Sequence, residues 1–214
     1  MANRSTSGFG LRMAMRLGNS PAIGGQSKYA IKSGLGVGIF KGNPASIQLA
    51  GDTGYIQDSA FSTTDDGNDG GIDFTTANDA LLVGVHNGVF YIDNTTSKPT
   101  FANSVAASTT FGTNPNTNST DGVAFVNDDP DQEYVVKADA AVGQAIFGLC
   151  GNINDFAAGD AKDGASTATF DSGTQAETKM FRIVRSAEDP DNEDLTVAGA
   201  NIIVVINAAA NTYR

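Results

Sequence analysis

The alternation of apolar and polar residues along this chain predicts strands and very little helix. A two-residue repeat is typical of a strand with one buried face. The runs that carry it are KYAIK at 28–32, GLGVGIF at 34–40, SIQLA at 46–50, GVAFVN at 122–127, QEYVVKA at 132–138, ATFD at 168–171 and MFRIVRSA at 180–187. The run NIIVVIN at 201–207 is apolar almost throughout, which predicts a central strand buried on both faces. Short strands with frequent turns predict an all-β fold, either a barrel or a sandwich.

Two further segments predict how these strands are connected. LLVGVHNGVFYID, residues 81–93, has two apolar runs joined by Asn87-Gly88. That dipeptide readily adopts the positive φ angles of a tight turn, so we expect a β-hairpin with His86 at a strand end. DAAVGQAIFGLC, residues 139–150, predicts a short helix or an irregular stretch. The fold is expected to contain at most one or two short helices.

Polar residues that favour turns predict two surface loops, near 58–74 and 93–121. The first contains the acidic run STTDDGNDGGID, and the second is rich in Thr, Asn and Ser. Asp-Pro-Asp occurs at 129–131 and again at 189–191, each time after an apolar run. Because proline presets φ and aspartate bonds nearby backbone, both sites are predicted to be turns of one type.

Four carboxylates between Asp128 and Glu133 make a calcium loop the main alternative to a turn. A calcium loop needs oxygen ligands at alternating positions, a glycine at its bend and a closing bidentate carboxylate. Pro130 interrupts that spacing, no glycine lies inside the stretch, and no later acid closes it. The turn is therefore favoured. An exposed cation site in the acidic loop at 63–73 is the weaker alternative.

Charge divides the chain into two unequal parts. The formal net charge is −11, yet residues 1–41 contain six Lys and Arg residues and no carboxylate. They carry +6, which leaves −17 for the remainder, the difference between −11 and +6. A basic segment on an acidic body suggests that the segment binds something negative. A solvated tail that needs charge only for solubility is the alternative.

The basic segment also has the pattern of a strand. Apolar residues at 11, 13, 15 and 17 alternate with Arg12, Ala14 and Arg16. We therefore predict an extended N-terminal arm at 1–27, able to add a strand to a neighbour's exposed sheet edge, and a single β-rich domain at 28–214. The residues expected to contact a partner are Arg4, Phe9, Leu11, Arg12, Met13, Met15, Arg16, Leu17 and Lys28.

The sequence offers little for catalysis. His86 and Cys150 are the only residues of their types, and neither has a partner at the spacing of a known nucleophile motif. Cys150 follows Phe147 and Leu149 closely, so it is expected to be a buried thiol. One His and one Cys also exclude a structural zinc site. We expect no enzymatic activity, no cofactor and no metal.

Two Asp-x-Gly triplets, at 52–54 and 171–173, resemble the paired carboxylates of an aspartic protease. The first follows Ala50-Gly51 instead of a hydrophobic strand, and the chain is short for two lobes of that kind, so ordinary turns are favoured. No apolar run reaches the length of a membrane span, and the acidic body disfavours specific nucleic-acid binding. Synthesis in the cytoplasm is expected.

Five stretches of the chain resemble a family of small proteins encoded beside the major capsid protein in tailed bacteriophages. They are MANRSTSGFG, SKYAIKSGLGVGIFKGNP, FYIDNTTSKPTF, VNDDPDQEYVVKAD and the closing order MFRIVRSAEDPDNED before NIIVVIN. Members of the family are regarded as capsid cement, or decoration, proteins. They occupy the outside of the virion shell and hold neighbouring capsid subunits together.

The resemblance implies a structural protein whose partners are the major capsid protein and copies of itself, as a trimer more readily than a dimer. It implies no catalytic residues. Another virion component, such as a tail or head-fibre protein, is the alternative. A surface-binding or hydrolytic domain that uses the Asp-x-Gly pairs is the least favoured hypothesis.

Overall fold

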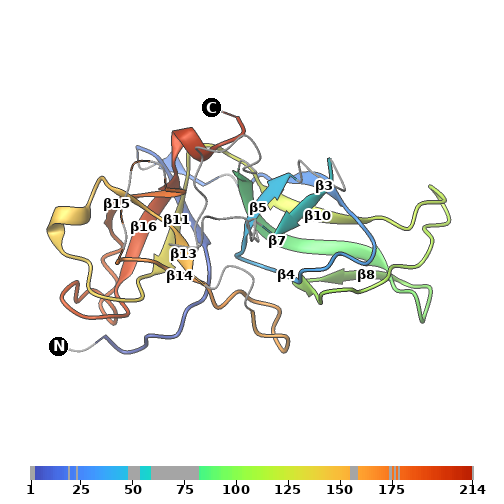
Figure 1. Ribbon diagram of the computed structural model, residues 1–214, viewed down its shortest axis with the longest axis horizontal. Coiled ribbons are helices and arrows are strands. Elements are labelled where there is room, and N and C mark those ends of the chain that lie inside the picture. Colours follow the sequence, from blue (N-terminus) through green and yellow to red (C-terminus); the bar gives the residue numbers. More distant parts are fainter. Residues whose placement is uncertain are drawn as a thin grey trace.

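The computed structural model describes residues 3–18, 20–22, 24–47, 54–58, 82–154, 159–173, 175, 177 and 179–213. Within these residues the fold is all-β, with two six-stranded antiparallel sheets that are not closed into a barrel. The prediction of an all-β fold is confirmed, as a sandwich rather than a barrel. Figure 1 shows the two sheets in opposite halves of the molecule, here called the first lobe and the second lobe.

The first lobe is built on the sheet with strand order β12-β15-β16-β11-β1-β2. Its strands are β12 (Cys150–Gly151), β15 (Phe181–Ser186), β16 (Asn201–Ile206), β11 (Gln132–Lys137), β1 (Arg12–Arg16) and β2 (Ser20–Pro21). The short pair β13 (Ile153–Asn154) and β14 (Thr169–Phe170) lies beside it. Every residue of β16 is buried, because β15 and β11 flank it and both of its faces are covered. The predicted central strand is confirmed.

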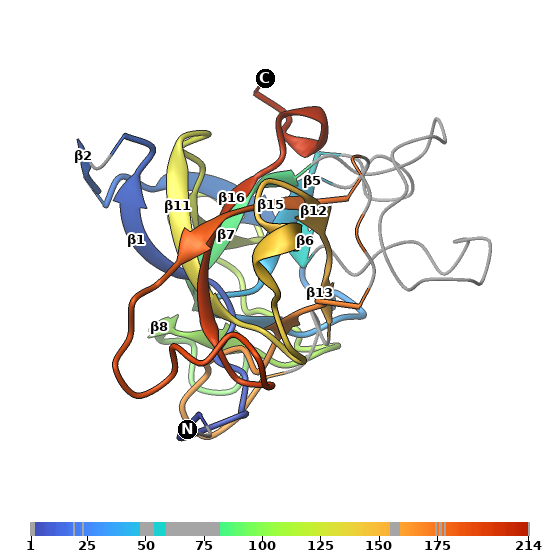
Figure 2. The same cartoon turned by 90° about the vertical axis from the view of Figure 1, so that its left-hand side faces the viewer.

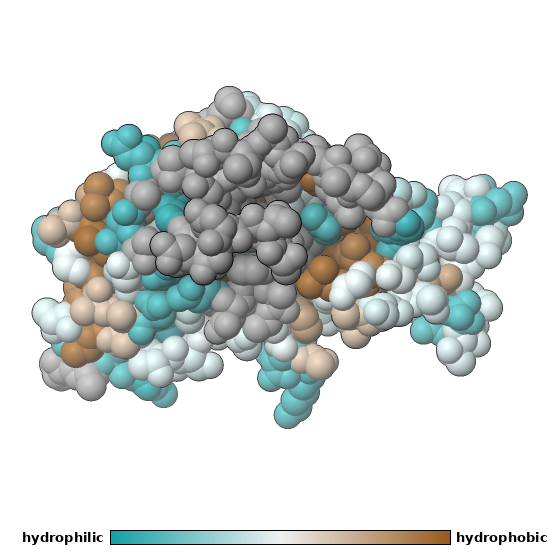
Figure 3. All heavy atoms as spheres, viewed as in Figure 1, coloured by the Kyte–Doolittle hydropathy of each residue, from teal (hydrophilic) through white to brown (hydrophobic). Residues whose placement is uncertain are grey.

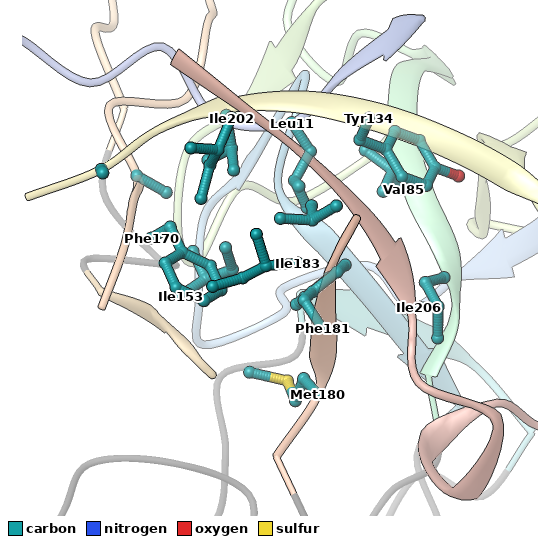
Figure 4. Packing of buried hydrophobic residues seen from close by; sticks show 14 of the residues in the cluster. Leu11, Val85, Tyr134, Ile153, Phe170, Met180, Phe181, Ile183, Ile202 and Ile206 are labelled. Atoms are coloured by element: carbon teal, nitrogen blue, oxygen red, sulfur yellow. The ribbon is translucent and has the colours of Figure 1, made fainter. Parts of the chain in front are cut away.

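One face of this sheet packs into the larger hydrophobic cluster. Tyr134 and Val136 of β11 meet Ile202, Val204 and Ile206 of β16 there, together with residues of β15 and β14. Burial of each large apolar side chain stabilises the fold by about 1.5 to 3 kcal/mol. Figure 4 shows these side chains converging from several strands. The alternation of residues 132–138 therefore reflects a buried face, as predicted.

The second lobe is built on the order β3-β10-β7-β5-β6, with β8 paired to β7. Its strands are β3 (Ser27–Ile31), β10 (Gly122–Asn127), β7 (Leu82–Ile92), β5 (Pro44–Ile47), β6 (Ile56–Asp58) and β8 (Pro99–Ala102). The pair β4 (Ile39–Phe40) and β9 (Ser104–Val105) lies beside them. The sheet curves, so that its outer strands β3 and β6 lie close together. Ile31, Ile56, Val89 and Val126 are buried inside the curve.

The two lobes share part of their core. Leu82 and Val85, from the start of β7 in the second lobe, belong to the hydrophobic cluster of the first. The turn at 128–131 joins β10 to β11 and so crosses from one sheet to the other. At its base the hydroxyl of Tyr134 donates to Asn127 Oδ1 at 2.8 Å. This junction couples the lobes through both buried apolar area and a buried hydrogen bond.

The predicted hairpin at Asn87-Gly88 is wrong. β7 is one eleven-residue strand that runs through both residues, and His86 lies in its interior. Opposite it, Val126 pairs with His86 and Phe125 pairs with Gly88, which leaves Asn87 as the extra residue of a β-bulge. The glycine has a φ of 148° and accommodates this bulge. Continuous pairing with β10, β5 and β8 gives the strand more hydrogen bonds than a tight turn would.

The predicted surface loop at 93–121 contains more structure than its composition suggests. β8 and β9 lie within it, and Val105 and Phe111 are buried in the second cluster. Turns at 94–96, 107–108 and 115–117 alternate with short stretches that find partners on β7 and β4. Most of the other predicted loop, 58–74, lies outside the described residues. Within the part of the chain that the structure describes, the two helical elements are single 3-10 turns, η1 (Gln144–Ile146) and η2 (Ala208–Ala210), in line with the expected scarcity of helix.

Candidate interaction surface

The N-terminal segment lies along the first lobe instead of extending away from it. Residues 12–16 form β1, as the alternation predicted, and β1 pairs antiparallel with β11 of the same chain. Met13 is opposite Tyr134, and Arg16 is opposite Gln132. The expected strand is confirmed, but its partner is the chain's own sheet and not the edge of a neighbour. The predicted boundary at residue 27 therefore does not separate an arm from a body.

The two Asp-Pro-Asp turns hold this segment at two points. At 189–191 the backbone N–H of Arg4 donates to the Asp191 carbonyl at 3.0 Å, and its guanidinium donates to Asp191 Oδ2 at 2.9 Å. At 129–131 the backbone N–H of Leu17 donates to the Asp131 carbonyl at 2.9 Å. There the Arg16 Nε lies 2.6 Å from Asp129 Oδ2. Each turn thus supplies one carbonyl to the segment, together with the Asp191 carboxylate at 189–191 and the carboxylates of Asp129 and Asp131 at 129–131.

The prediction of a common turn type is confirmed by matching internal hydrogen bonds. In each turn the backbone N–H of the second aspartate donates to the side chain of the first at 3.0 Å. The next residue, Gln132 or Asn192, donates its N–H to the carbonyl of the first aspartate. The carboxylates of the 128–131 turn face Arg16 and the Tyr29 hydroxyl, which donates to Asp128 Oδ2 at 2.8 Å. They act as separate hydrogen-bond acceptors for protein groups.

Between these points a buried lysine supports the segment. Lys137 is 2% exposed, and its Nζ donates to the Ser5 carbonyl at 2.9 Å and the Gly199 carbonyl at 3.1 Å. Burial lowers the pKa of Lys137, while the charge of Asp189 acts in the opposite direction. The Phe9 ring lies nearby, beneath the guanidinium of Arg12 at 4.3 Å from the ring centroid. Cation–π contact of this kind fixes both side chains.

Leu11 was predicted to contact a partner, and this prediction is wrong. Its side chain is 3% exposed and points into the hydrophobic cluster with Val85 and Ile183, as Figure 4 shows. Gly10 turns the chain inward with a φ of 69°, and a Cβ there would lie 2.5 Å from the Cβ of Ser166. Leu11 therefore anchors the segment to the body.

The remaining apolar residues of the segment stay at the surface. Met13, Met15 and Leu17 are 39%, 46% and 38% exposed. Lys28, on β3, is exposed as well. Arg12 remains accessible, whereas Arg4 and Arg16 are already engaged by aspartates of the same chain. Of the predicted contact residues, Met13, Met15, Leu17, Arg12 and Lys28 are therefore exposed, and Phe9 is half-buried beside Arg12.

The second lobe presents an aromatic face that sequence reasoning missed. Phe90 of β7 packs against Phe101 of β8 with centroids 4.7 Å apart, and Phe125 of β10 lies 6.4 Å from Phe101. Phe101 is 74% exposed, although it is a large apolar side chain. The sequence of β10 gave one indication of this face. Residues 123–126 are all apolar, although only alternate residues of the strand face the core, so an apolar residue must also lie on the outer face.

Two adjoining hollows, here together called the groove, lie between the segment and this aromatic face. One of about 450 Å³ is lined by Phe9, Met13, Arg12 and Lys41, and a second of about 470 Å³ is lined by Phe101 and Phe125. Asn87 and Asn103 line both hollows. In Figure 2, β1 and β8 lie on the same side of the view. Figure 3 shows that another face has hydrophobic residues at the surface of both lobes.

The residues considered for catalysis occupy structural positions. His86 is 1% exposed, its Nε2 lies 3.2 Å from the Gln57 carbonyl, and burial lowers its pKa to about 4. Cys150 is buried as predicted, and burial raises the pKa of its thiol. Asp171 accepts the backbone N–H of Gly173 at 2.8 Å, an ordinary turn contact. Asp52 lies outside the described residues.

Among the described residues, no three His, Cys, Asp or Glu side chains are grouped so that they could hold a metal ion. No helix in the described part of the chain has the length and apolar character of a membrane span. The predicted cation site at 63–73 lies outside that part.

Comparison of the chain with protein-family models, curated proteins and solved structures gave no match. The chemistry of the exposed surface is therefore the basis on which a function is inferred. Its distinctive features are the aromatic face and the groove that leads to it.

Proposed function

We propose that this protein is a structural capsid cement protein, which binds the outer surface of a phage head and stabilises contacts between major capsid protein subunits. The observation that carries the proposal is the Phe90, Phe101 and Phe125 face. Phe101 is 74% exposed and contacts two other rings, tilted against Phe90 and stacked with Phe125, so this aromatic area is costly to leave in water. Aromatic residues are enriched where proteins bind one another. The family resemblance supports the same function.

The contact surface on this proposal has two parts. The aromatic face supplies the central apolar area, and Met13, Met15 and Leu17 on and beside β1 supply a second apolar strip. Arg12 and Lys28 lie among them as exposed cations. Apolar residues surrounded by charged ones are the usual arrangement of a protein interface. The rigid sheets hold the rings in place, so little side-chain entropy is lost on binding.

The fold is suited to a cement protein because its N-terminal segment is held in place by contacts within the same chain. Arg4, Lys137 and Arg16 hold the segment against the first lobe, so its exposed side chains are presented in one arrangement. We propose that copies assemble as a trimer on the shell, where repeated contacts add to the avidity of each copy.

The test is occupancy on purified shells. Phe101→Ser removes the exposed ring from the face. We expect the protein concentration that gives half-maximal occupancy to rise about tenfold or more. Leu149→Ser is the matched control, because Leu149 is 44% exposed and precedes β12, at the opposite edge of the first sheet from β1 and β2. Unchanged occupancy of the Phe101→Ser protein, with its folded state intact, would contradict the proposal.

A further inference from the structure

We infer that the groove between β1 and the aromatic face binds an extended, acidic segment of the partner protein that carries apolar or aromatic side chains. This inference rests on the proposed function, because it specifies which part of the partner is bound. The groove is defined by the two adjoining hollows, which share Asn87 and Asn103. Its two ends are lined by residues from different lobes. Phe9 and Met13 lie at one end, and Phe101 and Phe125 lie at the other.

The charge of the groove selects an acidic occupant. Arg12 and Lys41 line it, and within the described residues neither side chain has a carboxylate partner. Among the described residues, Asp163 is the one acid in the lining, and its Oδ1 already accepts the backbone N–H of Ala165 at 2.9 Å. Lys28 does not line the groove, but it is a further exposed cation on β3, opposite Phe125. A basic groove on a protein with a net charge of −11 favours a negatively charged ligand over a second, equally acidic surface.

The amide side chains of the groove select an extended backbone. Asn87 Nδ2 donates to Gln26 Oε1 at 2.8 Å, and Asn103 Nδ2 donates to the Asp163 carbonyl at 3.0 Å. These bonds fix the orientation of both amides. In the described part of the chain, the two Asn side-chain oxygens have no donor of their own, so they can accept N–H groups from a peptide lying in the groove.

The two ends of the groove define the side chains of the occupant. Phe9 and Met13 form an apolar surface at the first end, where the Met13 sulfur accepts Asn127 Nδ2 at 3.0 Å. Phe101 and Phe125 form the aromatic surface at the second. An occupant with apolar anchors on either side of its carboxylates would satisfy both ends and the cations between them. A highly basic or purely polar segment would satisfy neither.

The experiment uses the full-length protein and an unstructured copolymer of glutamate and tyrosine as the probe. Binding is measured by fluorescence anisotropy with the wild type, Lys41→Glu, and Lys98→Glu. Lys98 is an exposed lysine in the turn before β8 that does not line the groove, so it controls for net charge. Lys41 is chosen over Arg12 because the Arg12 guanidinium also contacts Phe9.

We expect the copolymer to bind the wild type and the Lys98→Glu protein similarly, and to bind Lys41→Glu about tenfold more weakly. A copolymer of lysine and tyrosine is attracted to the acidic body of the chain wherever it binds, so Lys41→Glu should not weaken its binding. Equal affinity of the acidic copolymer for the wild type and Lys41→Glu, or an equal loss of affinity for the basic copolymer, would overturn the inference. If the wild type self-associated in sedimentation experiments and Lys41→Glu did not, the occupant would be a second copy and the inference would be wrong.

Shell occupancy separates this inference from the proposed function. If Phe101→Ser lowers occupancy while Lys41→Glu does not, the protein binds shells and the acidic occupant is rejected. If neither variant changes occupancy while the copolymer still prefers the wild type, the groove has the inferred chemistry and the capsid function fails.

Discussion

The two lobes differ in how far their outer sheet faces are covered by the rest of the chain. On the outer face of the first sheet, Ile203 and Val205 are only 4% and 5% exposed, although they point away from the main core. Glu133 on the neighbouring strand accepts a bidentate pair of bonds from Arg185 at 2.7 and 2.6 Å, and Lys137 binds the N-terminal segment. On the outer face of the second sheet, by contrast, Phe101 is 74% exposed and lies between the half-buried rings of Phe90 and Phe125.

This difference shows that the same strand pattern can serve stability in one lobe and binding in the other. The first sheet uses its own chain to cover both of its faces, with the N-terminal segment as part of the cover. The second sheet has a buried inner face and an outer face that needs a partner. Variants of matched residues in the two lobes should therefore change different quantities.

The largest expected difference is between Phe181→Ala and Phe101→Ala. Phe181 is fully buried in the first cluster, so its truncation leaves a cavity and should lower the free energy of unfolding by about 3 to 5 kcal/mol. Phe101 is 74% exposed, so its truncation should cost no more than about 1 kcal/mol and should act on binding instead. Urea denaturation of both proteins measures this. Similar losses of stability would show that the second face is not open.

The ion pair of the first lobe should give the next largest effect. Glu133 is 1% exposed, so Arg185→Met leaves a buried carboxylate without its cation and should destabilise the protein by about 3 kcal/mol. Glu133→Gln removes the buried charge and leaves Arg185 partly exposed to water, so it should cost less. Thermal unfolding of the two single variants tests this order. A larger loss of stability for Glu133→Gln would mean that the unpaired Arg185 guanidinium is more costly to the fold than the unpaired Glu133 carboxylate.

In the second lobe, His86 should make stability depend on pH. Burial lowers its pKa from 6.5 to about 4, so between these values the unfolded chain is protonated while the folded protein stays neutral. Stability is therefore present above pH 6.5 and is lost as the pH falls, by about 2 kcal/mol between pH 7 and pH 5. His86→Gln should remove this part of the slope. Urea denaturation at both pH values measures it, and an unchanged slope in the variant would contradict the assignment.

Local sequence patterns predicted the strands well because strand periodicity is a local property. β10 occupies 122–127 as predicted, and β16 is the buried central strand that its apolar run indicated. The Asp-Pro-Asp turns were also predictable, since their hydrogen bonds stay within a few residues. Asn87-Gly88 was misjudged because a bulge and a hairpin favour the same dipeptide. Only the partner strands β10, β5 and β8 distinguish them.

The candidate surface was predicted less well, because exposure depends on residues far away in the sequence. Leu11, Met13 and Met15 share one spacing, yet only Leu11 is buried, since Gly10 directs it under Val85. Arg4 and Arg16 looked available for a partner, but their aspartates lie 187 and 113 residues away. Phe101 was missed for the same reason. The local sequence around Phe101 does not indicate whether other parts of the chain cover the sheet face on which it lies.

The smallest expected effects concern the two turns that hold the N-terminal segment to the first lobe. Their contacts match, but the Arg16 and Asp129 side chains are 36% and 14% exposed, whereas those of Arg4 and Asp191 are 77% and 59% exposed. Water screens the second pair more strongly. Arg16→Met should therefore cost about 1 kcal/mol, reduced by added salt, and Arg4→Met should cost less than about 0.5 kcal/mol.

Urea denaturation at low and high salt measures both variants, with Lys98→Met as the control for loss of an exposed charge. If Arg4→Met proved the more costly, burial of the ion pair would not determine how strongly each turn holds the segment. The buried Lys137 contact to the Ser5 carbonyl would then be the part that Arg4 supports, because Ser5 follows Arg4 directly. Lys137→Met would separate the two explanations, since it removes that contact and leaves the Arg4 ion pair in place.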